Sequence, residues 1–371
     1  MELPVLNNLP AYRRANRPRL PDWLRKRLPA GGEMMQTRKL IDGLSLATVC
    51  ADARCPNQPE CWSRRTAVFM ILGRHCTRHC HYCAVQPGEP EPVAENEPAR
   101  VAEAAAALGL RHVVITSVTR DDLPDEGADH FRRCVAAVHD RLPGAIVEVL
   151  TPDFHARAEC IETVLSAGPA IFNHNIETVR RLTPVLRPQA DYERSLEVLH
   201  AASKTGPEGA RAHSRGRKPP ECACFSDQPR RGERNLAVAP SGLDKNGREP
   251  TGGSRPRLCA FGPSGLRVAN PLSVLVKSGL IIGLGETLAE IEQTLADLRA
   301  AGCQIVTIGQ YLAPTERSAP VLKFYHPDEF SELGRLARGM GFLSVASGPF
   351  VRSSYNAEAV YHQATAGQAD Q

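Results

Sequence analysis

Three cysteines stand close together in the stretch RHCTRHCHYC of this 371-residue chain. Cys76, Cys80 and Cys83 are separated by three and then by two residues, so one short loop can present three thiolates. Cysteine thiolates are the usual protein ligands of iron–sulfur clusters. Three of them can hold three irons of a four-iron cubane, which leaves the fourth iron open to a small ligand. The spacing therefore indicates a cluster with one exchangeable coordination position.

Zinc is an alternative for these thiols, because His75, His79 and His81 lie beside them. Structural zinc sites close with four ligands, commonly from C-x-x-C pairs with or without histidines. Three buried thiols without a metal are a further alternative. The spacing, with Tyr82 just before the last cysteine, resembles the signature of the radical S-adenosylmethionine (SAM) superfamily. That resemblance implies that SAM binds the open iron and is cleaved to a 5′-deoxyadenosyl radical.

A second cysteine triplet precedes the first. Cys50, Cys55 and Cys61 stand in CADARCPNQPECW, and a serine pair stands in RSSYNA near the carboxyl end. A serine pair alone is more often a helix cap or a turn. The two triplets with the serine motif resemble the lipoyl synthase family. The resemblance implies an auxiliary 4Fe-4S cluster held by these cysteines and a serine oxygen, with Ser354 preferred to Ser353.

The resemblance extends from about residue 20 to 203 and again from about 276 to 360. It implies a radical SAM sulfurtransferase that inserts sulfur at C6 and C8 of a protein-bound octanoyl group, giving the lipoyl cofactor. The implied cofactors are two 4Fe-4S clusters and S-adenosyl-L-methionine. The implied partners are an octanoylated lipoyl-carrier protein (lipoyl domain or glycine-cleavage H protein type) and a reductant protein such as ferredoxin or flavodoxin. The chain departs from the family pattern at Thr119, Glu126, Arg180 and Asn356.

Two other functions are compatible with two cysteine triplets. One is another radical SAM enzyme that carries an auxiliary cluster and inserts sulfur. The other belongs to a different class, a two-cluster electron carrier without SAM chemistry. An electron carrier needs no barrel that encloses a substrate, and reductive cleavage of SAM by the reconstituted protein distinguishes these classes.

Several further residues are candidates for SAM contacts. The stretch SGLIIGLGE fits the superfamily pattern G-x-I-x-G-x-x-E, and a glycine at a strand end lets a flat ligand approach the backbone. Polar residues at other strand ends can face a ligand, or can satisfy buried backbone groups instead. The predicted cofactor-binding residues are Tyr82, Ser117, Asn173, Asn175, Gly283 and Glu286. We assign no role to the remaining cysteines, Cys134, Cys160, Cys222, Cys224, Cys259 and Cys303.

The elements that must position these residues alternate between apolar β-rich runs and amphipathic helical stretches. The predicted strands are 67–73, 112–118, 145–153, 170–177, 278–286 and 305–312. Such alternation predicts parallel βα units of the α/β class, in a partial barrel or a doubly wound open sheet. The resemblance implies the former, a partial (β/α)6 TIM-like barrel of the radical SAM type. In both architectures, functional residues gather at the carboxyl ends of the strands.

We expect three parts along the chain. Residues 1–65 form an N-terminal extension that carries the auxiliary-cluster cysteines, and 66–345 form the barrel. Residues 346–371 form a C-terminal extension with the RSSY motif. The barrel is interrupted at 204–276 by a stretch rich in Gly, Pro, Ser and Arg without helical or strand period, which is typical of a disordered insertion.

Composition limits the possible partners. Hydrophobic residues make up 42% and charged residues 23% of the chain, as in ordinary globular proteins. Residues 205–275 hold 12 Lys and Arg against 6 Asp and Glu, so without them the formal charge of +4 becomes −2. We therefore expect no nucleic-acid partner. No apolar run is long enough to span a bilayer, and no export signal is apparent, so we expect no membrane association and a cytoplasmic location rather than a mitochondrial one.

Overall fold

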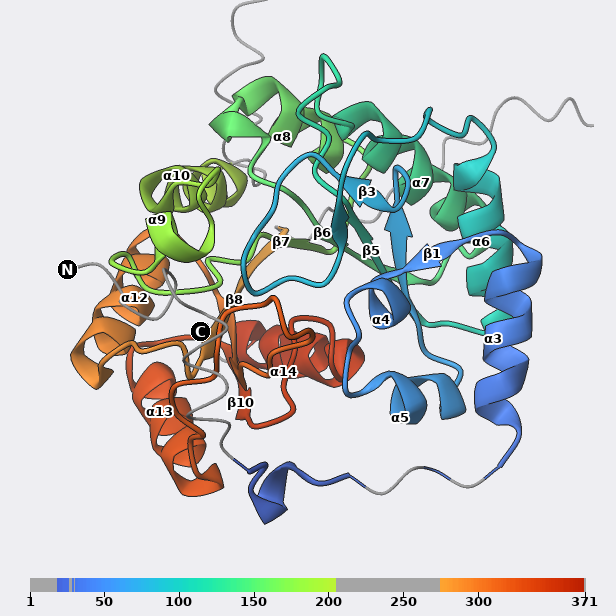
Figure 1. The fold of residues 1–371 in the computed structure, drawn as a ribbon. Helices are drawn as coiled ribbons and strands as arrows, with labels where there is room; N and C mark the ends of the chain where they lie inside the picture. Colours follow the sequence, from blue (N-terminus) through green and yellow to red (C-terminus); the bar gives the residue numbers. More distant parts are fainter. Residues whose placement is uncertain (1–18, 27–28, 30, 205–273, 370–371) are drawn as a thin grey trace, which may run out of the picture. The chain divides into compact units, whose positions relative to one another are not determined.

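An eight-stranded sheet forms the centre of the structure, and every neighbouring pair in it is parallel except the pair of β1 and β2 (Figure 1). The computed structural model describes residues 19–26, 29, 31–204 and 274–369, all of which belong to one compact unit. The parallel strands are β2 (Val68–Ile71), β5 (His112–Ser117), β6 (Ile146–Leu150), β7 (Ile171–Asn173), β8 (Leu275–Ile282), β9 (Ile305–Gln310) and β10 (Ser344–Gly348). All six predicted strands are therefore confirmed, and β10 is an additional one.

The order of the strands identifies the architecture as a partial barrel. The order β1-β2-β5-β6-β7-β8-β9-β10 follows the chain without reversal. A doubly wound sheet would reverse its order at a switch point, with helices on both faces. Here each crossover returns the chain to the next position in the same direction, and the helices surround the strands (Figure 1). The outermost strands, β1 (Ala47–Thr48) and β10, are not paired with each other, so the barrel is open.

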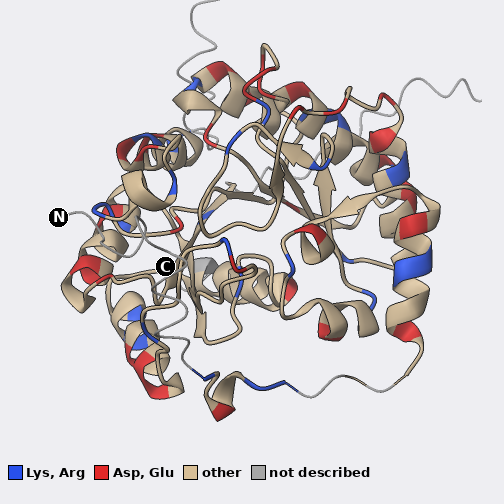
Figure 2. Ribbon diagram, viewed as in Figure 1, with Lys and Arg blue, Asp and Glu red and all other residues tan. Residues whose placement is uncertain are grey.

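Capping residues mark the start of α12 and the end of α6. The main helices are α3 (Glu33–Gly43), α6 (Glu97–Leu108), α7 (Ala128–Arg141), α8 (Ala158–Leu165), α10 (Tyr192–Lys204), α12 (Leu288–Ala300), α13 (Pro327–Gly339) and α14 (Ala357–Ala369). Thr287 caps α12 by accepting a hydrogen bond from the Glu290 amide, and Glu290 returns the bond, which makes a capping box. Gly109 ends α6 in the left-handed region, at φ 68°. Figure 2 shows that charged residues lie mostly on these helices and their loops.

A buried ion pair lies among the strands. The Lys277 ammonium on β8 lies 2.9 and 3.1 Å from the two carboxylate oxygens of Glu148 on β6, and neither side chain is exposed. Asn173 on β7 donates to the same carboxylate at 3.0 Å. Burial opposes ionisation of Glu148, but Lys277 and His112 hold its pKa down at about 2. This network joins four neighbouring strands, β5 to β8.

The two extensions lie at opposite ends of the sheet order. The N-terminal one supplies α3, β1, α4 (Val49–Asp52) and α5 (Gln58–Ser63), and the C-terminal one supplies α14. The sheet continues to Gly348, beyond the expected barrel end at residue 345. Leu275 and Val276, which we expected within the insertion, belong to β8 because their apolar run continues directly into that strand. Residues 205–273 lie outside the described residues, so the prediction that the insertion is disordered falls on residues that the structure does not describe.

No helix within the part of the chain that the structure describes is long and apolar enough to cross a bilayer.

The ion pair gives a stability prediction. Lys277→Met leaves the Glu148 carboxylate buried without its cation, and breaking a buried pair in this way costs about 3–5 kcal/mol. We therefore expect a clear loss of thermal stability in the single variant. The double variant Glu148→Leu/Lys277→Met should recover most of that loss, because neither charge is left. Thermal unfolding followed by circular dichroism measures both, and a double variant less stable than the single one would contradict the prediction.

The connection from α10 to β8 gives a second prediction. Such αβ connections lie on the barrel face opposite the carboxyl ends of the strands, and most contain 2–6 residues. Deleting residues 207–271 leaves five residues between Lys204 and Leu275 and keeps β8 complete. We expect this deletion variant to retain its fold, its iron content and its SAM cleavage, with greater resistance to limited proteolysis. Loss of iron from the deletion variant would show that the segment contributes to the cluster sites.

Candidate active site

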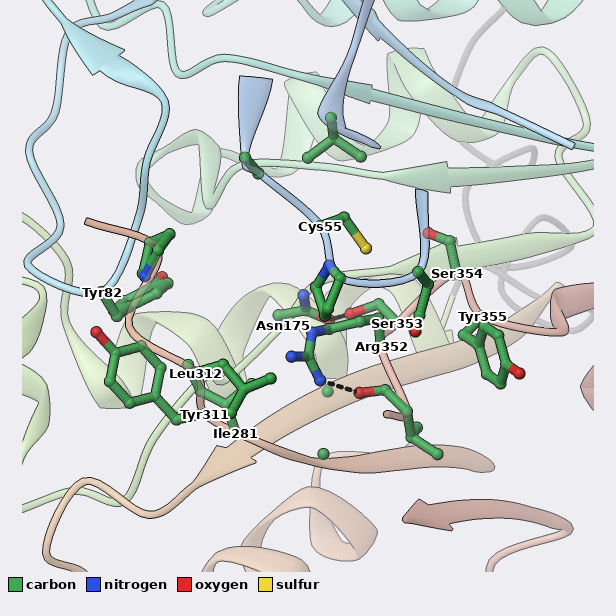
Figure 3. A pocket seen from close by; sticks show the side chains of 18 of the residues that line it. Cys55, Tyr82, Asn175, Ile281, Tyr311, Leu312, Arg352, Ser353, Ser354 and Tyr355 are labelled. Carbon is green, nitrogen blue, oxygen red and sulfur yellow. Dashed lines mark hydrogen bonds between the residues drawn. The ribbon is translucent and has the colours of Figure 1, made fainter. Parts of the chain in front are cut away.

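A cavity of about 450 Å³ opens among the carboxyl ends of the barrel strands (Figure 3). Its wall comes from three distant parts of the chain: the N-terminal extension, the loops after the strands, and the C-terminal segment. The candidate cluster ligands in its lining are Cys50, Cys55, Cys61, Cys83 and Ser354. Both cysteine triplets are thus represented around one cavity, as expected for groups that act in one reaction.

The N-terminal triplet is presented by two short helices and the loop between them. Cys50 lies on α4, which Thr48 caps by accepting a hydrogen bond from the Ala51 amide at 3.3 Å. Cys61 lies on α5, and Cys55 lies between the helices, where its amide donates to the Cys50 carbonyl at 3.1 Å. Burial raises the pKa of Cys50 to about 11 and that of Cys61 to about 12, and the neighbouring thiols add to both shifts. These thiols therefore carry protons until a metal ion binds and displaces them.

The triplet of Cys76, Cys80 and Cys83 begins on β3 (His75–Cys76) and continues in the following loop. The Arg78 and Thr119 amides each donate to the Cys76 sulfur at 3.4 Å, and the Val85 amide donates to Cys83 at 3.4 Å. Burial raises the pKa of Cys83 to about 12 and raises that of Cys80. Cys83 lines the cavity, whereas Cys76 and Cys80 are not part of its lining.

The histidines near this loop have other partners. The His75 ring nitrogen Nδ1 lies 2.8 Å from a Glu91 carboxylate oxygen. His79 and His81 contact each other edge to face, with ring centroids 6.0 Å apart. Among the described residues, neither contact brings an imidazole to the cysteine sulfurs, so the arrangement fits an iron–sulfur cluster better than zinc.

The C-terminal segment brings its serine pair to the cavity in two different ways (Figure 3). The Ser353 hydroxyl donates to the Asn175 side-chain oxygen at 2.9 Å, and Asn175 donates in turn to Glu177 at 3.1 Å. Ser354 lines the same cavity, and also a second one that includes Cys61. No hydrogen-bond partner of the Ser354 hydroxyl lies within the described part of the chain. Ser354 is therefore the serine available as a ligand.

Two partly buried ionisable residues, Glu177 and Arg352, lie beside these residues and were not predicted from the sequence. Burial lowers the pKa of Arg352, while Cys55 and Glu177 oppose that shift. Burial raises the pKa of Glu177, and Arg187 opposes it. Glu177 and Arg352 line the cavity between the two triplets. Both lie within the sequence stretches NHNIETV and RSSY, so a search for charged residues in those motifs would have found them.

The predicted SAM-binding residues divide into two groups. Tyr82 and Asn175 line the cavity. The others, Ser117, Asn173, Gly283 and Glu286, do not appear in its lining. Asn173 is fully buried against Glu148, and the Ser117 hydroxyl is buried without a hydrogen-bond partner among the described residues. Glu286 accepts hydrogen bonds from the amides of Gly283 at 2.6 Å and Leu284 at 2.9 Å, so it stabilises its own turn. SAM contacts of these four residues stay predictions.

A set of direct contacts holds the two chain ends together at the cavity. The Asn57 side-chain amide donates to the Phe350 carbonyl at 2.7 Å, and the Tyr355 hydroxyl donates to Glu60 at 2.9 Å. The Lys26 ammonium donates to both Asn57 and Glu60, at 2.6 and 2.7 Å, and lies 4.3 Å from the centre of the Phe350 ring. These contacts place the RSSY segment opposite the N-terminal triplet of Cys50, Cys55 and Cys61.

The donor set fits two four-iron clusters. Each triplet would supply three soft thiolate ligands on a short segment, and Ser354 lines the cavity on the side of the N-terminal triplet, where its oxygen would be a fourth ligand. Beside the Cys76, Cys80 and Cys83 triplet, the cavity is lined by Tyr82, Asn175 and Glu177, and Asn175 donates a hydrogen bond to the Glu177 carboxylate. A 4Fe-4S cluster held by these three cysteines would keep one iron without a cysteine ligand, and SAM would bind that iron through its amino and carboxylate groups.

Comparisons with known proteins agree with this geometry. The family model for the radical SAM superfamily matches residues 70–210, and the model for the N-terminal domain of lipoyl synthase matches residues 6–55. A lipoyl synthase of Rubrobacter xylanophilus is 43% identical over 349 residues, covering 94% of this chain and 88% of that protein. A lipoyl synthase of Nitratidesulfovibrio vulgaris is 42% identical over 344 residues, covering 93% of each.

A third relative, a lipoyl synthase of Symbiobacterium thermophilum, is 41% identical over 366 residues and covers 99% of this chain and 93% of that protein. Such identity over nearly the whole chain, together with two cysteine triplets and a serine around one barrel cavity, leaves one family. The chain belongs to the lipoyl synthase family of radical SAM enzymes.

Proposed function

We propose that this chain inserts two sulfur atoms, at C6 and C8, into an octanoyl group carried by a partner protein, and that the common cavity is where this occurs. The observation that supports the proposal most strongly is the joint lining of that cavity by Cys83 of one triplet and by Cys50, Cys55 and Cys61 of the other. As a member of its family, the chain uses SAM and two 4Fe-4S clusters. An electron carrier would need no such enclosed space.

The cofactors supply the chemistry that side chains cannot. When bound, SAM with its cluster supplies the radical that removes hydrogen from an unactivated methylene or methyl carbon, and the auxiliary cluster supplies the sulfur atoms. The protein residues enclose this chemistry. Ile281 and Leu312 give the cavity an apolar wall suited to an acyl chain, and that wall excludes water. Asn175 and Ser353 supply the polar side.

Ser354 has a proposed role of its own. A cluster that gives up sulfur during the reaction benefits from one iron whose protein ligand is displaceable. A serine oxygen is a harder ligand than a thiolate and suits iron in a sulfur-rich cluster less well. Because the Ser353 hydroxyl is already engaged in a hydrogen bond to Asn175, we assign Ser354 as the serine ligand of the auxiliary cluster.

The proposed partners follow from the reaction. We expect an octanoylated lipoyl domain or a glycine-cleavage H protein as carrier, and a ferredoxin or flavodoxin as electron donor. A cytoplasmic location belongs to the same proposal, because every cysteine in the described residues is a free thiol, as iron–sulfur assembly needs.

The division of labour between the triplets can be tested with two substitutions. Cys55→Ala should retain 5′-deoxyadenosine formation and abolish the lipoyl product, because only the sulfur source is lost. Cys80→Ala should abolish both, because it removes a ligand of the SAM cluster. Anaerobically reconstituted protein, an octanoyl peptide and mass spectrometry measure both products, and equal loss of SAM cleavage in the two variants would contradict the division.

The serine pair allows a matched comparison. Ser354→Ala should lower the iron content of the auxiliary site and the lipoyl yield while SAM cleavage continues. Ser353→Ala removes one hydrogen bond to Asn175, a loss of about 0.5–1.5 kcal/mol, and should leave the iron content unchanged. Measurements of iron content and lipoyl yield in the two variants show which serine is the ligand of the auxiliary cluster. If Ser353→Ala lost iron and Ser354→Ala did not, the ligand assignment would have to be exchanged.

A further inference from the structure

Arg78, which lies midway between Cys76 and Cys80 in the chain, makes an unusual set of contacts. Arg78 is 6% exposed, although it lies in a loop at the rim of the barrel. Its guanidinium donates to both carboxylate oxygens of Asp121, at 2.8 and 2.7 Å. It also donates to both oxygens of Asp153, at 2.8 and 2.9 Å. Two bidentate pairs from one guanidinium use its planar donor geometry nearly completely.

These pairs connect three separate loops. Asp121 follows β5 and Asp153 follows β6, while Arg78 belongs to the cysteine loop after β3. Burial alone would disfavour the Arg78 charge, but the two carboxylates raise its pKa. The same interaction lowers the pKa of Asp153, whose side chain is fully buried. The four hydrogen bonds from the Arg78 guanidinium to the two carboxylates hold the three loops together.

The cysteine loop and the β5 loop also meet at a sulfur atom. Thr77 donates through its amide and its hydroxyl to the Thr119 carbonyl, each at 3.1 Å. The Thr119 amide donates to the Cys76 sulfur at 3.4 Å, and so does the Arg78 amide. The Arg78–Asp121 ion pair is a further connection between the two loops, because it holds the β5 loop at a position two residues after Thr119. Thr77 also contacts Asp121, because its hydroxyl donates to the carboxylate at 3.1 Å and accepts from the Asp121 amide at 3.2 Å. The direction of both N–H groups toward Cys76 thus depends on a set of contacts between the two loops to which the Arg78 guanidinium contributes two hydrogen bonds.

We propose that Arg78 is a positioning residue for the SAM cluster, acting through Cys76. The proposal rests on the assignment of Cys76, Cys80 and Cys83 to that cluster in the proposed function. Hydrogen bonds to the sulfurs of a cluster stabilise its reduced, more negative form and so raise its reduction potential. When the Arg78 side chain is replaced, the hydrogen bonds from the backbone amides of residues 78 and 119 to the Cys76 sulfur become weaker, and the cluster becomes harder to reduce.

Another arginine provides a matched control. Arg157 donates to the Pro124 carbonyl at 2.8 Å and lies 3.1 Å from the Glu126 carboxylate, so it also joins the loops after β5 and β6. It makes no hydrogen bond to residues 74–83 of the cysteine loop within the described part of the chain. Arg157→Gln therefore removes a comparable loop contact without disturbing the surroundings of Cys76.

The test uses the reconstituted holoenzyme and the electron paramagnetic resonance signal that changes when SAM is added. In Arg78→Gln we expect the reduction equilibrium of that cluster to shift tenfold or more toward the oxidised form, about 59 mV for one electron. SAM cleavage should fall about 10–100-fold, the usual effect of losing a partner that orients a metal ligand. Iron at the auxiliary site should stay unchanged, and Arg157→Gln should match the wild type throughout.

A second variant separates positioning from simple destabilisation. Arg78→Gln leaves Asp153 with Arg194, at 3.4 Å, as its remaining cationic partner. The double variant Arg78→Gln/Asp153→Asn removes that buried charge, so it should fold as stably as the wild type and still show the shifted reduction equilibrium. An unchanged equilibrium in the double variant, or an equal shift in Arg157→Gln, would overturn the proposal. A wild-type protein without any SAM-dependent signal would instead overturn the proposed function.

Discussion

The hydrogen bond from the Asn57 amide to the Phe350 carbonyl connects residues that are 293 positions apart in the chain. The cavity depends on this contact and on its neighbours, the Tyr355–Glu60 hydrogen bond and the Lys26 bridge. An open barrel has no wall of its own on the side where its edge strands stop. The N-terminal and C-terminal extensions supply that wall. Together they place Ser354 opposite the N-terminal triplet of Cys50, Cys55 and Cys61.

Buried ion pairs hold the barrel together at two levels. Lys277 and Glu148 lie among the strands with no exposed side-chain surface, and Arg78 joins the loops at the carboxyl ends. A buried pair contributes little net stability, but an unpaired member is costly, so each pair penalises any rearrangement that would separate its members. The consequence for function is a rigid frame around the cavity. Radical chemistry requires that rigidity, because in each of the two hydrogen abstractions the radical must react with one particular carbon atom of the acyl chain.

Much of this could be predicted from the sequence, for local reasons. The six strands are apolar runs bounded by turn residues, and each cysteine triplet is short enough in sequence to present its thiols together. β10 was missed because SVASG consists largely of small residues without a clear period. Contacts between distant residues could not be predicted. The burial of Asn173 against Glu148, and the different partners of Ser353 and Ser354, depend on side-chain directions that only the folded barrel determines.

The most direct test of the account is an anomalous diffraction map at the iron edge, from crystals of the anaerobically reconstituted protein. The account predicts two four-iron sites bordering one cavity. One should be bound by Cys50, Cys55, Cys61 and the Ser354 oxygen, and the other by Cys76, Cys80 and Cys83 with one iron free of protein ligands. A single iron site, or an auxiliary cluster without contact to Ser354, would contradict the claim that the two chain ends together complete the active site.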